Sequence, residues 1–218
     1  MAESVGVLTV GEQVLPRGRH AAPPEVVAMS QHDRMVVAMA AAVADKGYAR
    51  VAVADVISGA GVSRRTFYEQ FANKEECFLA SYDVFVGALL EAITAAADEA
   101  GEDASARMLA SSSAYLTNLA GHPQFARTFL IEVLGAGAAA LDRRELVHQR
   151  FAGQIGREYE RLRAQRPGLP EAGPRRCRAL VGAIHELVIE TLLADGPQAL
   201  PALLPELLEI ERRLLAVA

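Results

Sequence analysis

The feature that most constrains this chain is a helical spacing of apolar residues that runs from Gln31 almost to the C-terminus. Gly or Pro interrupts the spacing near 47, 61, 101, 121–123, 135–137, 167–174 and 196–201. Apolar side chains at three- and four-residue steps indicate amphipathic helices, whereas a half-buried strand would show strict alternation. We therefore predict an all-α fold, with short loops between antiparallel helices.

The interruptions divide the chain into three predicted parts. Residues 1–29 carry several prolines and no sustained period, which predicts a flexible N-terminal arm. Residues 30–85 form a small domain of three short helices, at about 31–46, at 53–60 and after Ser63, which is joined to a long helix at 73–97. Residues 86–218 form a larger helical body, with helices at about 104–119, 123–134, 138–165, 174–194 and 199–217.

Charge and cysteine content exclude several classes of protein. The net charge of −5 argues against a protein that coats nucleic acid through bulk electrostatics, so any DNA contact must be local. Cys77 and Cys177 lie far apart and outside any metal-ligand spacing, which indicates neither a disulfide framework nor a zinc site. No signal sequence and no run of the roughly 18–20 apolar residues of a membrane span is apparent, so we expect a cytoplasmic protein without a membrane partner.

The most informative segment, residues 52–71, has the pattern of a helix-turn-helix. A short helix is followed by a glycine corner at Gly61 and by a second helix that Ser63 is placed to cap. Glycine allows the sharp turn between two packed helices, and a small cap suits a recognition helix that presents its N-terminal end to DNA. Phe67 and Phe71, four residues apart, are expected to face the core of the small domain.

The second helix of this motif carries the candidate DNA contacts. Arg64 and Arg65 lie in its first turn, where a guanidinium group can pair with guanine edges or grip a phosphate. Tyr68 lies about 100° around the helix from Phe67, so its hydroxyl can reach the sugar–phosphate backbone. The complete set of candidate DNA contacts is Ser63, Arg64, Arg65, Thr66, Tyr68, Gln70 and Lys74.

The segment Ala-Gly-Val-Ser-Arg-Arg-Thr-Phe-Tyr-Glu-Gln-Phe at 60–71, followed by Asn-Lys-Glu at 73–75, resembles the recognition segment of the TetR/AcrR family. The resemblance covers roughly residues 31–85. It implies an all-helical homodimer in which the matched positions, here Arg64, Arg65, Thr66, Tyr68, Gln70 and Lys74, contact operator DNA, and in which the remaining helices form a regulatory body.

Three positions depart from the family pattern. Ala52 stands where the family usually has a threonine that caps the first helix of the motif, so a side-chain cap worth about 1 kcal/mol is missing. Arg65 stands at a position where the family commonly has a small residue, and Gln70 stands where the family commonly has a histidine. The operator sequence therefore cannot be inferred from relatives.

The C-terminal helices predict dimerisation. Their apolar stripes are wider than one buried face needs, and a two-fold four-helix interface through residues of about 174–217 would cover the surplus. A thicker core in a monomer is the alternative. The stripes comprise Leu180, Val181, Ile184, Leu187, Val188, Leu192, Leu203, Leu204, Leu207, Leu208, Ile210, Leu214 and Leu215.

The resemblance also implies a small, largely apolar effector held within the body. Candidates by helix position are Phe85, Leu89, Met108, Ser112, Tyr115, Phe129, Phe151 and His185. An ordinary core is the alternative interpretation of such residues. An effector would act by favouring a shape of the body in which the two heads no longer match successive grooves, with helix 73–97 transmitting the shift.

No catalytic, metal or cofactor motif is evident. His148 and His185 lack a metal-ligand spacing, and no GxSxG, Walker or paired-carboxylate pattern occurs. The head itself is neutral between Gln31 and Glu76, with six basic and six acidic residues, which leaves a helical ligand carrier or enzyme as the rival interpretation. We predict a DNA-binding transcriptional regulator, a repressor that binds a palindromic operator as a homodimer.

Overall fold

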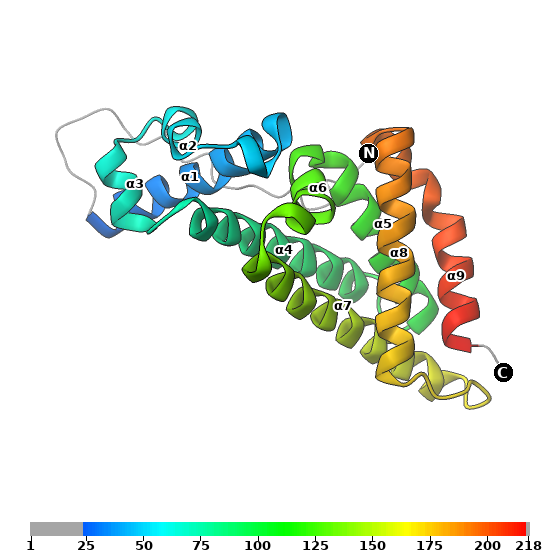
Figure 1. The fold of residues 1–218 in the computed structure, drawn as a ribbon. Coiled ribbons are helices and arrows are strands. Elements are labelled where there is room, and N and C mark those ends of the chain that lie inside the picture. The colour runs from blue at the N-terminus through cyan, green and yellow to red at the C-terminus, as the bar shows by residue number, and fades with distance from the viewer. Residues whose placement is uncertain (1–23, 217–218) are drawn as a thin grey trace, which may run out of the picture.

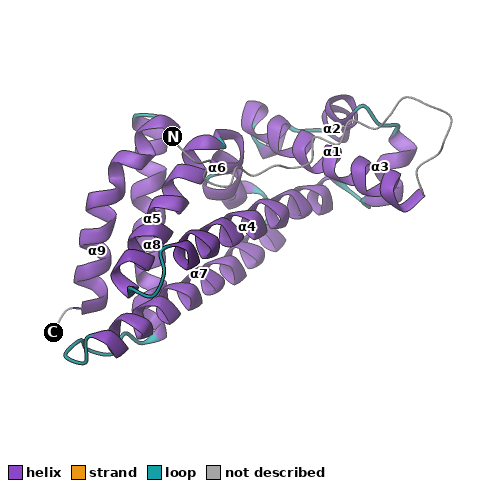
Figure 2. Cartoon of the chain, turned by 180° about the vertical axis from the view of Figure 1, so that it is seen from behind, coloured by secondary structure: helices purple, strands orange, loops and turns teal. Residues whose placement is uncertain are grey.

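The computed structural model describes residues 24–216, and all regular structure in that range is helical (Figures 1 and 2). The α-helices are α1 (Pro24–Lys46), α2 (Val53–Ala60), α3 (Arg64–Gln70), α4 (Lys74–Glu99), α5 (Ala104–Gly121), α6 (Pro123–Leu130), α7 (Ala138–Gln165), α8 (Pro174–Ala194) and α9 (Leu204–Ala216). Three 3₁₀ segments join them: η1 (Tyr48–Arg50), η2 (Glu132–Gly135) and η3 (Pro197–Leu203). The predicted all-α class is confirmed.

The head at one end of the molecule consists of α1, α2 and α3 (Figure 1). Its core is formed by apolar side chains that recur along one stripe of each helix, as the helical period requires. Met35 and Met39 of α1, Val56 of α2 and Phe67 of α3 are fully buried there. Burial of these side chains packs the three short helices into one unit.

Helix α4 runs from the head into the body, where it lies beside α7 (Figure 1). Asn73 caps its first turn by accepting a hydrogen bond from the backbone N–H of Glu76 at 2.9 Å. Among the described residues, α4 is long and apolar enough to cross a membrane, a test that core helices of soluble proteins also pass. Ten of its residues are buried in the helical bundle, which accounts for its apolar character.

The body is completed by α5, α6, α7, α8 and α9. Helix α5 packs against α4 and α7, and α8 packs against α7 and α9 (Figure 2). Helix α6 lies between the body and the head and contacts α1. The interior of the body is therefore enclosed by helices that come from both halves of the chain.

Three predicted boundaries differ from the structure. Helix α1 begins at Pro24 and not near 31, since proline is favourable in the first turn of a helix. The helix predicted at 123–134 ends at Leu130, and η2 follows. The helix predicted at 199–217 is divided, because Pro201 lacks an N–H group and lies in η3, so that α9 begins only at Leu204. Residues 24–29 of the predicted arm belong to α1, and residues 1–23 lie outside the described residues.

A second connection between head and body is made by η1 and η2. The backbone N–H of Tyr48 donates a hydrogen bond of 2.9 Å to a carboxylate oxygen of Glu132. Arg127 of α6 contacts the same carboxylate at 3.4 Å. Together with the contact of α1 on α6, this bond attaches the head to the body independently of α4.

Candidate nucleic-acid interface and internal cavity

The corner between α2 and α3 depends on two glycines. Gly61 has φ of 61° and ψ of 39°, the left-handed conformation that ends α2 and that other residues adopt at a cost. Gly59 lies two residues earlier, where an added Cβ would stand 3.1 Å from the Cβ of Ala38 on α1. The glycines therefore set both the turn of the chain and the close approach of α2 to α1.

The two helices of the motif are capped differently. Ser63 accepts a hydrogen bond of 3.0 Å from the backbone N–H of Thr66, so the predicted cap of α3 is present. Ala52 provides no side-chain cap for α2, as expected from the sequence. The carboxylate of Asp55 instead accepts from the backbone N–H of Ala52 at 2.9 Å and pairs with Lys46 at 2.6 Å. The hydrogen bond from Lys46, followed by that from Ala52, lowers the pKa of Asp55.

Helix α3 separates a buried side from an exposed side. Phe67 and Phe71 are buried in the head, with ring centroids 5.7 Å apart. Arg64 and Arg65 are exposed, and Tyr68 is 48% exposed. The helix is one of the outermost elements of the molecule (Figure 1). Its arginine-bearing side is therefore free to meet a partner.

The exposed cations of α3 are held in place by local contacts. Arg65 pairs with Glu69 one turn further on, at 2.8 Å, and this hydrogen bond raises the pKa of Arg65. The guanidinium carbon of Arg64 lies 5.8 Å from the centroid of the Tyr68 ring. Among the described residues, Arg64 makes no ion pair. A surface ion pair such as that of Arg65 contributes little and exchanges readily for a phosphate.

The remaining candidate contacts lie around this face. Thr66 and Gln70 are half-buried, and the Thr66 hydroxyl lies 2.9 Å from that of Ser63. Lys74 is half-buried at the start of α4, where its ammonium donates a 3.0 Å hydrogen bond to the carbonyl of Tyr48. The same ammonium lies 4.2 Å from the centroid of the Tyr48 ring. Lys74 thus ties α4 to η1 and presents only part of its charge to solvent.

The family model for bacterial regulatory proteins of the tetR family matches residues 37–81, which include α2, α3 and the corner between them. The head of the chain therefore belongs to the tetR family of bacterial regulatory proteins. The match lies within the head that the sequence pattern predicted. A comparison with curated proteins gives no match for this chain.

Solved structures extend the likeness to the whole fold of the chain. The fatty acid degradation regulator FadR from Bacillus halodurans is 18% identical, and the match covers 91% of this chain and 98% of that one with a TM-score of 0.75. FadR from Bacillus subtilis in complex with stearoyl-CoA is 19% identical, with coverage of 85% and 98% and a TM-score of 0.70. A TetR-family regulator from Syntrophomonas wolfei is 15% identical, with coverage of 86% and 96% and a TM-score of 0.71. At these identities the likeness establishes the fold alone.

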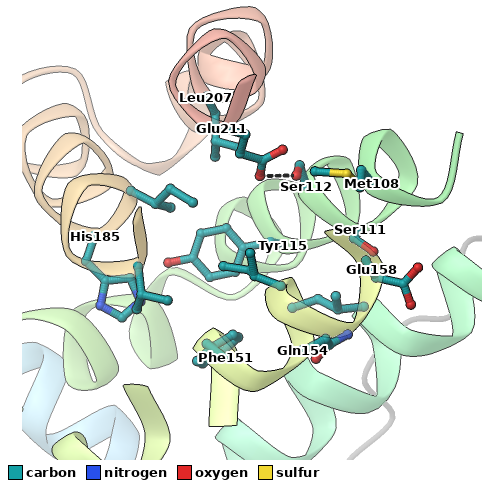
Figure 3. A pocket seen from close by; sticks show the side chains of 14 residues that line it. Met108, Ser111, Ser112, Tyr115, Phe151, Gln154, Glu158, His185, Leu207 and Glu211 are labelled. Atoms are coloured by element: carbon teal, nitrogen blue, oxygen red, sulfur yellow. Dashed lines mark hydrogen bonds between the residues drawn. The ribbon is translucent and has the colours of Figure 1, made fainter. Parts of the chain in front are cut away.

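A cavity of about 80 Å³ lies in the body among α4, α5, α7, α8 and α9 (Figure 3). Five of the eight residues predicted as effector contacts line it: Met108, Ser112, Tyr115, Phe151 and His185. The other three, Phe85, Leu89 and Phe129, are buried in the neighbouring core. Phe129 still touches the wall, since its ring lies 5.5 Å from that of His185 between centroids.

The cavity also has polar residues that the sequence analysis did not identify. Glu211 of α9 is 7% exposed and accepts a 2.8 Å hydrogen bond from the Ser112 hydroxyl. Burial raises its pKa to about 7. Leu207 and Glu211 are four residues apart, so the sequence places both on one face of the helix. A carboxylate in an amphipathic helix normally points to solvent, however. Only the packing of α9 on α5 shows that this one faces inward.

His148 and His185 form a buried pair beside the cavity. Their ring centroids are 4.4 Å apart, and neither nitrogen of His148 has a hydrogen-bond partner among the described residues. Burial lowers the pKa of His148 to about 4 and that of His185 well below its ordinary value. Both rings are therefore neutral at neutral pH. No group of three or more His, Cys, Asp or Glu residues in the described part of the chain is arranged to hold a metal.

Proposed function

We propose that this regulator is a repressor that binds a palindromic operator as a homodimer and is released by a small, largely apolar effector. The arrangement of α3 carries the proposal, because Phe67 and Phe71 fix the helix to the head while Arg64 and Arg65 extend into solvent. A capped helix with arginines in its first turn is suited to the major groove. Tyr68, beside them, is placed to contact the sugar–phosphate backbone.

Dimerisation is supported by the outer surface of α8 and α9. Leu187 and Leu208 are only half-buried, and Leu193 is 64% exposed. A Cβ at Gly182 would meet no atom within 4 Å, so this face of α8 is open to a closely approaching helix. A two-fold interface of α8 and α9 from each subunit would cover these side chains with the same surface of the partner.

Release by an effector is supported by the path of α4. Ile93 of α4 lines the cavity, while Lys74 at the other end of the same helix is bonded to the head. The contact between Glu132 and Tyr48 provides a second path through η2. A ligand that enlarges the cavity would displace these elements and change the distance between the two heads of a dimer.

DNA binding is tested by replacing Arg64 and Arg65 with Ala in one double variant. Because both guanidinium groups lie outside the buried core, the fold should persist. Affinity for the DNA upstream of the regulator's own gene, measured by fluorescence anisotropy, should fall by about a hundredfold or more, with a smaller dependence on salt. Arg157→Ala, which removes an exposed arginine from α7, is the matched control and should bind as the wild type does.

Equal affinity of the double variant and the wild type would refute the proposal. So would a wild-type protein that binds its upstream DNA no better than unrelated DNA of the same length. Either result would favour the rival interpretation, in which the head makes only protein contacts.

A further inference from the structure

The cavity of the body has an uneven distribution of charge. Its fourteen lining residues include two carboxylates, Glu158 and Glu211, and no Lys or Arg. Glu158 is neutralised by Arg107, which donates hydrogen bonds of 2.8 and 3.0 Å to it. Glu211 has no such partner among the described residues and is bonded only to the neutral Ser112 hydroxyl. The wall therefore has one buried carboxylate whose charge is unmatched.

Other polar groups of the wall lack partners as well. Tyr115 is 6% exposed, yet its hydroxyl has no hydrogen bond among the described residues, and neither has the Ser111 hydroxyl. His185 is neutral, since burial lowers its pKa, so it does not supply the missing positive charge. In Figure 3 Glu211 reaches from α9 toward Ser112, and the hydroxyl of Tyr115 points away from this pair, toward α8. Buried polar groups left without partners are the exception in folded proteins and indicate a ligand that completes them.

We infer that the effector of this cavity is a small apolar molecule with a protonated amine, whose nitrogen donates a hydrogen bond to Glu211. The inference rests on the proposed function, because it assigns a chemical class to the effector of the same site. An ammonium group would match this unpaired carboxylate, which is only 7% exposed. The rings of Tyr115 and Phe151 would contact its apolar part.

The same geometry disfavours an anionic ligand head in the cavity. A carboxylate would place a like charge against Glu211, where no cation of the wall offsets the repulsion. The structural likeness to a regulator in complex with stearoyl-CoA establishes the fold alone and does not assign a ligand to this chain. Because burial raises the pKa of Glu211 to about 7, an ammonium ligand would also draw this carboxyl into its ionised form.

Three probes of one shape test the inference: 2-phenylethylamine, 2-phenylethanol and phenylacetate. A single ring is chosen because the cavity is only about 80 Å³. Binding to the full-length protein is measured by protein-observed NMR titration at pH 7.5. The amine should bind at least about tenfold more tightly than phenylacetate, with the alcohol between them. Glu211→Gln keeps an acceptor oxygen for Ser112 and should abolish the preference for the amine.

Glu209→Gln is the matched control, because Glu209 lies on the same helix but pairs with Arg212 and Arg213 at the surface. This variant should retain the preference of the wild type. The inference is overturned if phenylacetate binds the wild type as tightly as the amine, if Glu211→Gln keeps the preference, or if none of the three probes binds. The DNA affinity of the same preparations separates the two ideas: intact DNA binding without a preference for the amine leaves the proposed function standing.

Discussion

At the scale of single residues, a few positions carry constraints that their residue type alone does not show. Gly61 must adopt a left-handed conformation for α3 to leave α2 at the observed angle. Glu211 is an acid held inside the body, although an acid on an amphipathic helix is expected in solvent. Glycine at position 61 avoids the backbone strain that another residue would have there. Burial of the Glu211 carboxyl group, by contrast, costs free energy of folding.

Two glycine substitutions should change stability in opposite directions. Gly61→Ala places a Cβ on a residue with φ of 61° and should destabilise the fold by about 1 kcal/mol. Gly87→Ala lies inside α4, where a Cβ would meet no atom within 4 Å, and should stabilise by about 0.5–1 kcal/mol. Urea denaturation followed by circular dichroism measures both. A stabilised Gly61→Ala variant would contradict the role assigned to the corner.

Glu211 should make stability depend on pH in a defined direction. Its folded pKa of about 7 lies above the ordinary value, so the folded state binds more protons and loses stability as pH rises from about 4.5 to 7. Glu211→Gln should therefore be more stable than the wild type at pH 8, by up to about 3 kcal/mol, and equal to it below pH 4.5. Denaturation of both proteins across this range tests the difference.

The buried histidines His148 and His185 act in the other direction, because their lowered pKa values cost stability as pH falls below about 6.5. The wild type and the Glu211→Gln variant both contain these histidines. The difference in stability between the two proteins therefore reports on the Glu211 carboxyl group alone. A constant difference in stability across the pH range would show that Glu211 is not buried in the folded protein.

At the scale of elements, the head is joined to the body twice, by the continuous helix α4 and by the bond between η1 and η2. The first connection is covalent and passes the cavity at Ile93. The second includes the carboxylate of Glu132, which accepts from the backbone N–H of Tyr48, and is accompanied by the packing of α1 on α6. Because the head is attached at two places, a movement of the body changes the orientation of the head as well as its distance from the body.

Glu132→Ala should loosen the second connection. The backbone N–H of Tyr48 would lose its acceptor at a half-buried position, which costs about 1–2 kcal/mol. Amide exchange in the segment 47–51, measured by mass spectrometry, should become about tenfold faster. Glu132→Gln retains an acceptor oxygen and should exchange nearly as slowly as the wild type. Equal protection in the Ala variant would mean that the contact of α1 on α6 alone holds the head.

At the scale of the whole molecule, α8 and α9 carry apolar side chains that the fold leaves half-buried or exposed, namely Leu187, Leu193 and Leu208. A second copy of the chain would cover them and would also supply the second recognition helix that a palindrome requires. The proposed interface and the proposed DNA-binding face are thus coupled, although they lie on different domains.

Replacing Leu187 and Leu208 together by Glu should convert the proposed dimer into a monomer, as measured by sedimentation equilibrium. Affinity for the upstream DNA should then fall by more than about a hundredfold, because the two heads no longer bind as one unit. Leu146→Glu is the control, since Leu146 is 55% exposed on α7 and lies outside this face. A wild-type protein that is monomeric at micromolar concentration would contradict the interface.

The sequence by itself determined the helical class, most helix limits in the body and the orientation of α3. Apolar period, capping residues and glycine corners are local signals, so Ser63, Phe67 and Phe71 lie where their spacing predicts. The start of α1 at Pro24 and the division of the last helix at Pro201 were not predicted, because proline is compatible with either a helix start or a break.

Only the tertiary structure decided which side chains meet. The cavity joins residues of five helices, and Ser112 and Glu211 bond across 99 positions of sequence. No period along one helix reveals which neighbour its polar residues will face. For the same reason, the ion pair between Lys46 of α1 and Asp55 of α2 depends on how these two helices pack. Helices are specified by neighbours in sequence, whereas a site is specified by the packing of distant segments.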